Sequence, residues 1–129
     1  MTPTISIIIV PGWRDSGPGH WQSLWAERLP NARRVVQDDW ITPTRTAWVG
    51  QLEKTVLAAP NPVVIVAHSL GCILTAAWAQ VSRSTGRVQG ALLVAPGDPE
   101  RDELRGVLPS WAPIVRQRLP FPSVLVGSR

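Results

Sequence analysis

Five short runs of strand-forming residues, most of them apolar and separated by helix-like segments, constrain the fold of this 129-residue chain most strongly. The runs cover residues 5–10, 32–37, 63–66, 88–95 and 123–127. Most of them are nearly continuous rather than alternating, which is typical of strands buried on both faces of a parallel sheet. The intervening segments are long enough for crossover helices. The sequence therefore predicts an α/β fold, with a doubly wound, mostly parallel sheet in the order 2-1-3-4-5 and helices on both faces.

Capping and helix-breaking residues place the helices. The second helix is expected to begin with Thr42 as N-cap and Pro43 as its first residue, and Pro30 ends the first. Pro109 and Pro113 weaken the prediction of the last helix. We expect helices over residues 20–29, 43–59, 72–78, 100–107 and 110–119.

Composition excludes several classes of protein. The length fits one domain, residues 1–129, and the apolar runs are too short to cross a membrane. Residues 1–4 lack the positive charge that begins a secretory signal, and Cys72 is the only cysteine, so a reducing, cytoplasmic location is expected. The net charge of +4 comes from scattered basic residues, which argues against a nucleic-acid partner. The sequence has no metal-ligand cluster, and neither a metal nor another cofactor is predicted.

The segment Val66-Ala67-His68-Ser69-Leu70-Gly71 carries the main functional signal. It joins an apolar strand to a helix-like stretch and flanks its serine, two residues away on each side, with Ala67 and Gly71. A serine on such a sharp strand-to-helix turn is a nucleophile elbow, where small neighbours leave room for a strained backbone. The alternative is an ordinary helix N-cap serine. The apolar strand before it and the helix after it favour Ser69 as a nucleophile that accepts an acyl group.

The predicted topology brings a second segment to the same place. Doubly wound sheets place their sites outside the carboxyl ends of the strands, so the loops that follow the strands meet at one edge. Ser69 follows the third strand, and Gly12 follows the first. Trp13 comes directly after Pro11-Gly12, where its side chain can line a pocket. The topology and the motif therefore both predict a site at the carboxyl edge of the sheet.

Three segments together resemble a known group: Pro11-Gly12-Trp13, Gly19-His20-Trp21-Gln22 and the elbow around Ser69. The chain resembles the small α/β-hydrolase family related to retinoblastoma-binding protein 9, whose bacterial members are described as serine hydrolases or esterases. The resemblance runs from Ile5 to Ser128. It implies that Ser69 is the catalytic nucleophile and that the backbone N–H groups of Leu70 and Trp13 form the oxyanion hole. The implied substrate is a small-molecule acyl ester or amide, hydrolysed through a Ser69 acyl-enzyme.

The sequence departs from this family towards its end. In the family the triad acid follows the fifth strand, and the histidine follows a sixth, whereas here no acid follows Gly127 and no histidine follows His68. We therefore expect the domain to be incomplete at the C-terminus, lacking the last strand–helix unit, with the triad Asp and His beyond residue 129. Such a chain should be nearly inactive by itself. Its fifth strand should be an exposed edge that is open to foreign pairing.

Other titratable residues are weighed as substitutes and as pocket residues. His68 adjoins Ser69, but adjacent side chains at an elbow diverge. His20 opens a helix, where a pocket-lining or helix-start hydrogen-bonding role is favoured over that of a base. Asp98, after the fourth strand, is a candidate acid by position, but a turn role in Pro96-Gly97-Asp98-Pro99 is favoured. With Gly12, these three residues complete the candidate pocket.

Two other classes of function stay open. One is a catalytically incompetent binding domain, or a gene fragment, with the hydrolase fold. The other is a flavodoxin-like nucleotide binder, although the glycines at 12, 17 and 19 match no phosphate-binding motif. No specific protein partner is inferred, because the Leu-x-Cys-x-Glu segment of the named relative has Leu74 here in place of Glu.

Overall fold

The computed structural model describes residues 5–127, and its elements form one parallel five-stranded sheet in the order β2-β1-β3-β4-β5. This is the predicted order. Residues 1–4, which bear on a secretory signal, and Ser128 lie outside the described residues. The strands are β1 (Ser6–Val10), β2 (Ala32–Arg34), β3 (Val63–His68), β4 (Val88–Val94) and β5 (Ser123–Val126). The helices are α1 (Trp21–Arg28), α2 (Arg45–Ala58), α3 (Leu70–Val81) and α4 (Asp102–Arg105), with 3₁₀ turns at Thr85–Arg87 and Pro109–Trp111.

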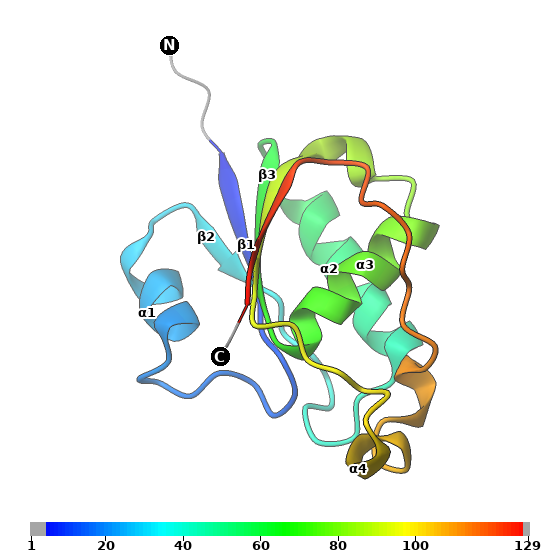
Figure 1. Cartoon of the computed structure of the whole chain (residues 1–129). Helices are drawn as coiled ribbons and strands as arrows, with labels where there is room; N and C mark the ends of the chain where they lie inside the picture. The colour runs from blue at the N-terminus through cyan, green and yellow to red at the C-terminus, as the bar shows by residue number, and fades with distance from the viewer. Residues whose placement is uncertain (1–4, 128–129) are drawn as a thin grey trace.

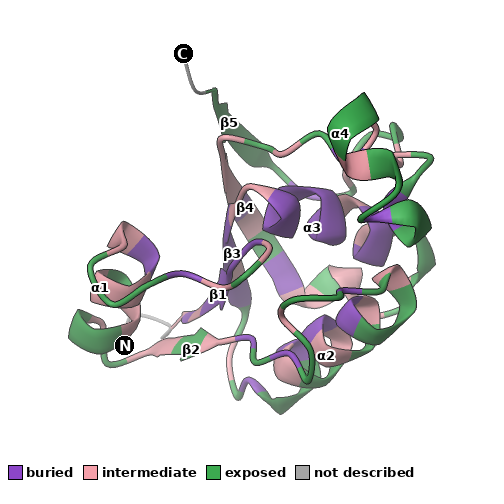
Figure 2. Cartoon of the chain, turned by 90° about the horizontal axis from the view of Figure 1, so that it is seen from below, coloured by how far each residue is buried: buried purple, intermediate pink, exposed green. Residues whose placement is uncertain are grey.

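Helices cover both faces of the sheet, as the alternating pattern predicted. Helices α2 and α3 lie side by side on one face, whereas α1 lies on the other, near β1 and β2 (Figure 1). Purple ribbon, which marks buried residues, concentrates in β1, β3 and the inner side of α3 (Figure 2). The core between the sheet and α2–α3 is built on large side chains, of which Trp48, Leu52, Leu74 and Trp78 are at most 1% exposed.

The start of α2 differs from the prediction. The helix begins at Arg45 with Thr44 as N-cap, not at Pro43 with Thr42 as N-cap. The Asp39 carboxylate accepts hydrogen bonds from the backbone N–H groups of Ile41 (3.0 Å) and Thr42 (2.9 Å), which makes a turn of this segment. The Pro43 carbonyl accepts a bond from the indole of Trp111 (3.2 Å). Trp111, which is distant in the sequence, therefore holds Pro43 outside the helix. The residues around Pro43 give no indication of this contact.

The predicted helix over 110–119 does not form. Only the 3₁₀ turn at its beginning is helical, and the rest follows an irregular path from the start of α2 along α3. Trp111 is fully buried and packs edge-on against Trp48, with ring centroids 5.5 Å apart. The Arg45 guanidinium donates to the carbonyl oxygens of Trp111 (2.5 Å) and Pro113 (2.6 Å). Tertiary anchoring therefore adds to the breaking effect of Pro113.

Several other elements are shorter than predicted. Strand β2 ends at Arg34 rather than at residue 37, and α4 spans four residues. Strand β5 is exposed along its whole length, with Val124 and Leu125 each more than 60% exposed, and it forms one edge of the sheet. Among the described residues, no helix combines the length and the apolar character that a membrane span requires.

Candidate active site

Ser69 occupies the single-residue corner between β3 and α3. Its backbone has φ 55° and ψ −122°, in a region that non-glycine residues rarely adopt. An N-cap serine would have extended backbone and a side chain that accepts from the helix, but the Ser69 hydroxyl makes no capping bond. Its backbone N–H donates to Val94 at the end of β4 (3.1 Å). The geometry is that of an elbow and not that of a helix cap.

Gly71 is the residue that makes this corner sterically feasible. A Cβ at position 71 would lie 2.4 Å from the Val10 carbonyl oxygen and 2.9 Å from that of Pro11. Backbone atoms cannot move aside as a flexible side chain does, so the first turn of α3 rests directly on the end of β1. The glycine of the motif is thus explained by helix–strand contact.

Two further glycines bring neighbouring loops onto the elbow. A Cβ at Gly12 would lie 3.0 Å from Ser69 Cβ and 3.2 Å from the Leu70 nitrogen. A Cβ at Gly97, in the loop after β4, would lie 3.2 Å from Ser69 Oγ and 3.4 Å from the same nitrogen. Gly97 was absent from the predicted site. The available signal is its position two residues after the predicted end of the fourth strand, residue 95, at the carboxyl edge of the sheet. A larger residue there would crowd the Ser69 hydroxyl.

The backbone N–H groups predicted to form an oxyanion hole are free of protein acceptors within residues 5–127. Leu70 is the first residue of α3, so its N–H has no partner within the helix. The Trp13 N–H likewise has no acceptor, whereas Arg14 and Asp15 donate to Trp40 and Gly12. The Trp13 indole donates to the Ile41 carbonyl (2.8 Å), which holds the ring on the loop before α2.

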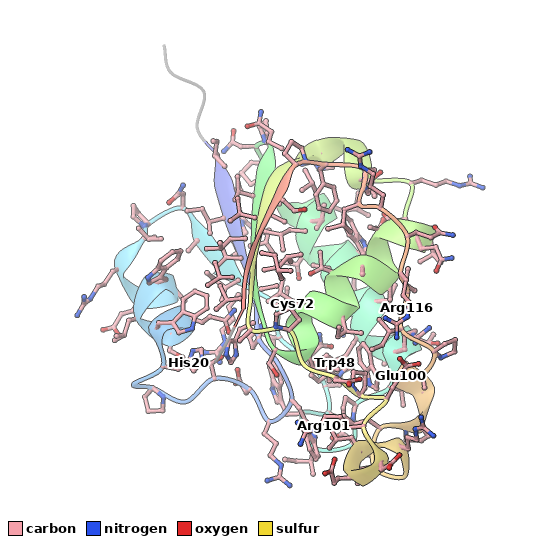
Figure 3. All side chains as sticks on the ribbon, viewed as in Figure 1. His20, Trp48, Cys72, Glu100, Arg101 and Arg116 are labelled. Carbon is pink, nitrogen blue, oxygen red and sulfur yellow. The ribbon has the colours of Figure 1, made fainter. Side chains whose placement is uncertain are left out.

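The two histidines lie together, with ring centroids 4.6 Å apart in an edge-to-face arrangement. His20 Nδ1 accepts the Gln22 backbone N–H (3.1 Å), so His20 is the N-cap of α1, the helix-start role expected of it. Burial, and then the neighbouring His20, lower the pKa of His68. Among the described residues, neither imidazole is hydrogen-bonded to Ser69. Figure 3 shows His20 at the end of α1, on the side of the sheet opposite α2 and α3.

The nearby carboxylates are engaged in structural contacts. Asp98 is exposed and accepts the Glu100 backbone N–H (3.0 Å), which is the turn role favoured by the sequence. Asp15 pairs with Arg34 and accepts the Ser16 N–H (2.6 Å). Within the described part of the chain, neither acid is paired with a histidine.

Cys72 is the other nucleophilic side chain near the elbow. It is buried one turn into α3 (labelled in Figure 3), and its Sγ lies 3.5 Å from the Val94 carbonyl oxygen. Burial raises the pKa of its thiol to about 12, against the weaker effect of that hydrogen bond. The thiolate is therefore scarcely populated at neutral pH, and Ser69 is the better candidate.

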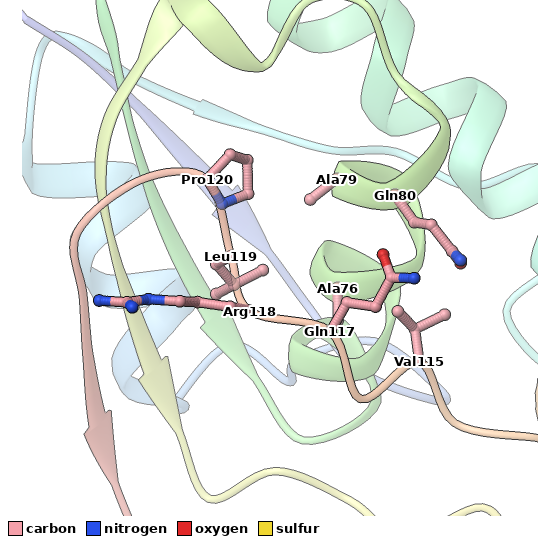
Figure 4. A pocket seen from close by; sticks show the side chains of 8 residues that line it. All are labelled: Ala76, Ala79, Gln80, Val115, Gln117, Arg118, Leu119 and Pro120. Atoms are coloured by element: carbon pink, nitrogen blue, oxygen red, sulfur yellow. The ribbon is translucent and has the colours of Figure 1, made fainter.

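A separate cavity of about 220 Å³ lies between the outer side of α3 and the segment before β5. Ala76 and Ala79 line it from the helix, and Leu119 and Pro120 line it from the segment (Figure 4). Neither Ser69 nor any other predicted site residue lines this cavity. The candidate site is instead the open carboxyl edge above β1, β3 and β4.

Backbone strain marks the same edge independently of the motif. Among residues 5–127, the non-glycine residues with positive φ are Arg14, Asp15, Ser69 and Ala95. They follow β1, β3 and β4 at the carboxyl ends of these strands. Strained backbone persists where surrounding structure enforces it, and it is concentrated at functional sites.

Comparison with known proteins identifies the family of the chain. The family described as serine hydrolase matches residues 7–129. Among solved structures, the chain is similar to a YdeN-like hydrolase from Pectobacterium atrosepticum, with 28% sequence identity and a TM-score of 0.76. The match covers 94% of this chain and 61% of that protein, so the chain spans about three fifths of its length. Comparison with curated proteins gave no match.

Proposed function

The chain belongs to the serine hydrolase family, and on that premise we propose that Ser69 is the nucleophile for hydrolysis of small acyl esters or amides. The observation that carries the proposal is the Ser69 backbone, with φ 55° and ψ −122°, together with a hydroxyl that caps no helix. A strained corner that frees one hydroxyl at the carboxyl edge of a parallel sheet suits attack on a bound carbonyl group. The narrower kinship with retinoblastoma-binding protein 9 and the cytoplasmic location remain predictions.

In the proposed reaction, Ser69 Oγ attacks the carbonyl carbon while its proton passes to a general base. The carbonyl oxygen becomes negatively charged and accepts hydrogen bonds from the N–H groups of Leu70 and Trp13. The tetrahedral intermediate then expels the alcohol or amine, which takes up the proton, and leaves the acyl group on Oγ. Water repeats the sequence and releases the acid. Removing one oxyanion donor typically lowers such rates by about 10²–10³.

Within residues 5–127, no side chain is placed to act as general base for Ser69. His20 accepts a backbone N–H with Nδ1, and His68 lies against His20 rather than against the serine hydroxyl. We propose that the working enzyme takes its triad Asp and His from residues beyond position 129, which the greater length of the similar hydrolase supports. Without them the chain should keep only the part of catalysis that comes from binding and the oxyanion hole, about 10³–10⁴ over water.

The test is hydrolysis of an activated phenyl ester by the chain, its Ser69→Ala variant and a matched Ser123→Ala variant on exposed β5. We expect a slowly formed acyl adduct on Ser69, detected by mass spectrometry, in the chain and in Ser123→Ala but not in Ser69→Ala, while the slow turnover that comes from binding and the oxyanion hole persists in all three. Lack of an acyl adduct on Ser69, or the same adduct in Ser69→Ala, would rule out Ser69 as the nucleophile. Fast, Ser69-dependent turnover would instead contradict the proposal that the base lies elsewhere.

A second candidate is a binding domain that keeps the fold without the chemistry. The observation that favours it is that no base contacts Ser69 among the described residues. A fluorophosphonate separates the two functions, because an oxyanion hole beside an accessible hydroxyl should allow slow modification of Ser69 even without an activating base, whereas a binding domain that lacks this arrangement should show none. A complete lack of Ser69 adduct after prolonged incubation would support the binding domain.

A further inference from the structure

Gln22 is a fully buried polar residue in α1, and its whole amide group is engaged. Its Nε2 donates to the carbonyl oxygens of Val10 (3.0 Å) and Val66 (3.1 Å), and its Oε1 accepts from Ser16 Oγ (2.8 Å). The orientation of the amide is fixed, since a flip would place its oxygen against two other acceptors. Burial of a polar amide costs free energy unless it is satisfied, as it is here.

The two carbonyls belong to the strands that lead into the candidate site. Val10 is the last residue of β1 and precedes the Pro11-Gly12-Trp13 loop, and Val66 lies three residues before Ser69 in β3. Val10 pairs with Ala67 in the sheet, so Gln22 spans two adjacent strands at the last residue of β1 and three residues before Ser69. A change in the spacing of these strand ends would move the Trp13 N–H relative to the Leu70 N–H.

The Val10 carbonyl is also the atom on which α3 rests. A Cβ at Gly71 would meet this oxygen at 2.4 Å, and Gln22 Nε2 reaches the same oxygen with a hydrogen bond. Gln22 therefore holds the atom that sets the position of the first turn of α3. That turn begins with Leu70, whose N–H is one of the two proposed oxyanion donors.

A second set of contacts ties the loop after β1 to the same helix. The Ser16 carbonyl accepts from Ser23 Oγ (3.1 Å) and from the Arg34 guanidinium (3.0 Å), while the Ser16 hydroxyl donates to Gln22. This loop contains two of the strained residues, Arg14 and Asp15. Its conformation, and with it the direction of the Trp13 N–H, is held from α1 and β2.

We propose that Gln22 is a positioning residue that fixes the Trp13 and Leu70 amides relative to each other, and so orients the oxyanion hole. The inference rests on the proposed function of Ser69 and deepens it. Gln22 does not touch the reacting atoms. Its effect should appear in the formation of a tetrahedral adduct and not in the initial binding of the reagent.

The experiment measures modification of Ser69 in the intact chain by a fluorophosphonate, followed by mass spectrometry at several reagent concentrations. In this step Ser69 Oγ forms a bond to phosphorus, fluoride leaves, and the hydroxyl proton passes to the buffer. The described residues supply no base, so the rate depends strongly on the oxyanion hole. Gln22→Met, which is close in size and lacks all three hydrogen bonds, is compared with the unmodified sequence.

We expect Gln22→Met to lower the maximal rate of modification about 10- to 100-fold, because misplacing a donor by about 1 Å costs that order. The reagent concentration at half-maximal rate should change less than about twofold. The matched control is Glu53→Gln, which disturbs a polar network at the other end of α3 and should leave the rate within about twofold. A rate for Gln22→Met within twofold of the unmodified chain would overturn the inference and leave Ser69 as the nucleophile.

Two further measurements keep the outcome decisive. If Gln22→Met does not fold, Ser16→Ala removes one of the three bonds and should slow modification about threefold, whereas an unchanged rate overturns the inference. If Ser69→Ala is modified as fast as the unmodified chain, the proposed function fails. The amide resonances of Trp13 and Leu70 then decide the positioning role: they should shift in Ser16→Ala and not in Glu53→Gln, and unshifted resonances overturn it.

Discussion

The two ends of α3 treat polar groups in opposite ways. At the N-terminal end, Ser69 is strained, its hydroxyl caps nothing, and the Leu70 N–H has no protein acceptor among the described residues. At the C-terminal end, the Glu53 carboxylate accepts hydrogen bonds from the Trp78 indole (2.8 Å) and from the hydroxyls of Ser82 (2.6 Å) and Ser84 (2.8 Å). Among the described residues, polar groups at one end have no protein partner, whereas those at the other end join α2, α3 and the following turn. The N-terminal end of α3 therefore carries the candidate nucleophile, and the C-terminal end makes contacts that stabilise the fold.

Of the changes that test this comparison, Gly71→Ala should have the largest effect on the free energy of unfolding. The new Cβ would overlap the Val10 and Pro11 carbonyls, so we expect a loss of about 3 kcal/mol or more in the free energy of unfolding, measured with denaturant. Gly50→Ala is the matched control, since Gly50 lies within α2 with open space around it. That change should stabilise the chain by about 0.5–1 kcal/mol. Equal effects of the two changes would show that the close contact at position 71 is not real.

Glu53→Gln should come next and should act on the opposite end. An amide offers one fewer acceptor to three donors, so we expect about 1–3 kcal/mol of destabilisation by denaturant unfolding. Glu27→Gln, on an exposed position of α1, is the control and should change stability by less than about 0.5 kcal/mol. If Glu53→Gln also abolished modification of Ser69, the two ends would not be separate.

Ser69→Gly should separate strain from chemistry. Glycine adopts positive φ without the penalty of a Cβ, so we expect a gain of about 1 kcal/mol in stability together with complete loss of modification at position 69. Ser69→Ala is the control, because it removes the hydroxyl and keeps the strain. Thermal melts of the pair provide the measurement, and identical melting temperatures would mean that the corner stores no strain.

The smallest expected effect is on the pH dependence of stability. It should differ between His68, next to the N-terminal end of α3, and Glu53, at the C-terminal end. The pKa of His68 is lowered by burial and by His20, so its contribution to stability is complete above the unfolded value of about 6.5 and is lost as the pH falls through the folded value. Burial raises the pKa of Glu53, but bonds from Ser82, Trp78 and Ser84 outweigh this effect and lower it. The Glu53 contribution should therefore be lost only at more acidic pH, below the unfolded value of about 4.3.

Melting temperatures of the chain and of His68→Asn between pH 7.5 and 5 would test the first part. The decline over that range should be shallower in His68→Asn. A decline of equal slope would show that burial and the neighbouring His20 do not disfavour protonation of His68 in the folded chain.

The strand order and the elbow could be predicted because their signals are local and continuous. The apolar run that becomes β3, followed at once by a serine between small residues, contains the strand, the turn and the start of the helix within one segment. The role of His20 as a helix cap also follows from nearby sequence, whereas the small residue at Gly71 is predicted but its contact with Val10 and Pro11 is not. The features that could be predicted depend on few distant contacts.

What could not be predicted depends on distant partners. Trp111 holds Pro43 outside α2 across 68 positions of sequence, and Gln22 reaches Val66 across 44. Gly97 acquires its place beside Ser69 only when β3 and β4 pair. Such contacts leave no periodicity and no motif, so the sequence alone identifies the residue types but not their neighbours.

The exposure of β5 has a consequence for how the molecule opens. Its four residues are exposed and hydrogen-bond to one neighbouring strand, whereas β1 and β3 are central and buried. Subglobal unfolding should begin there, so β5 amide protons should exchange with deuterium well before those of β3. Opening of β5 would free one side of β4 while β1 and β3 stay paired, so the corner at Ser69 would keep its contact with Val94 only as long as β4 remains on β3.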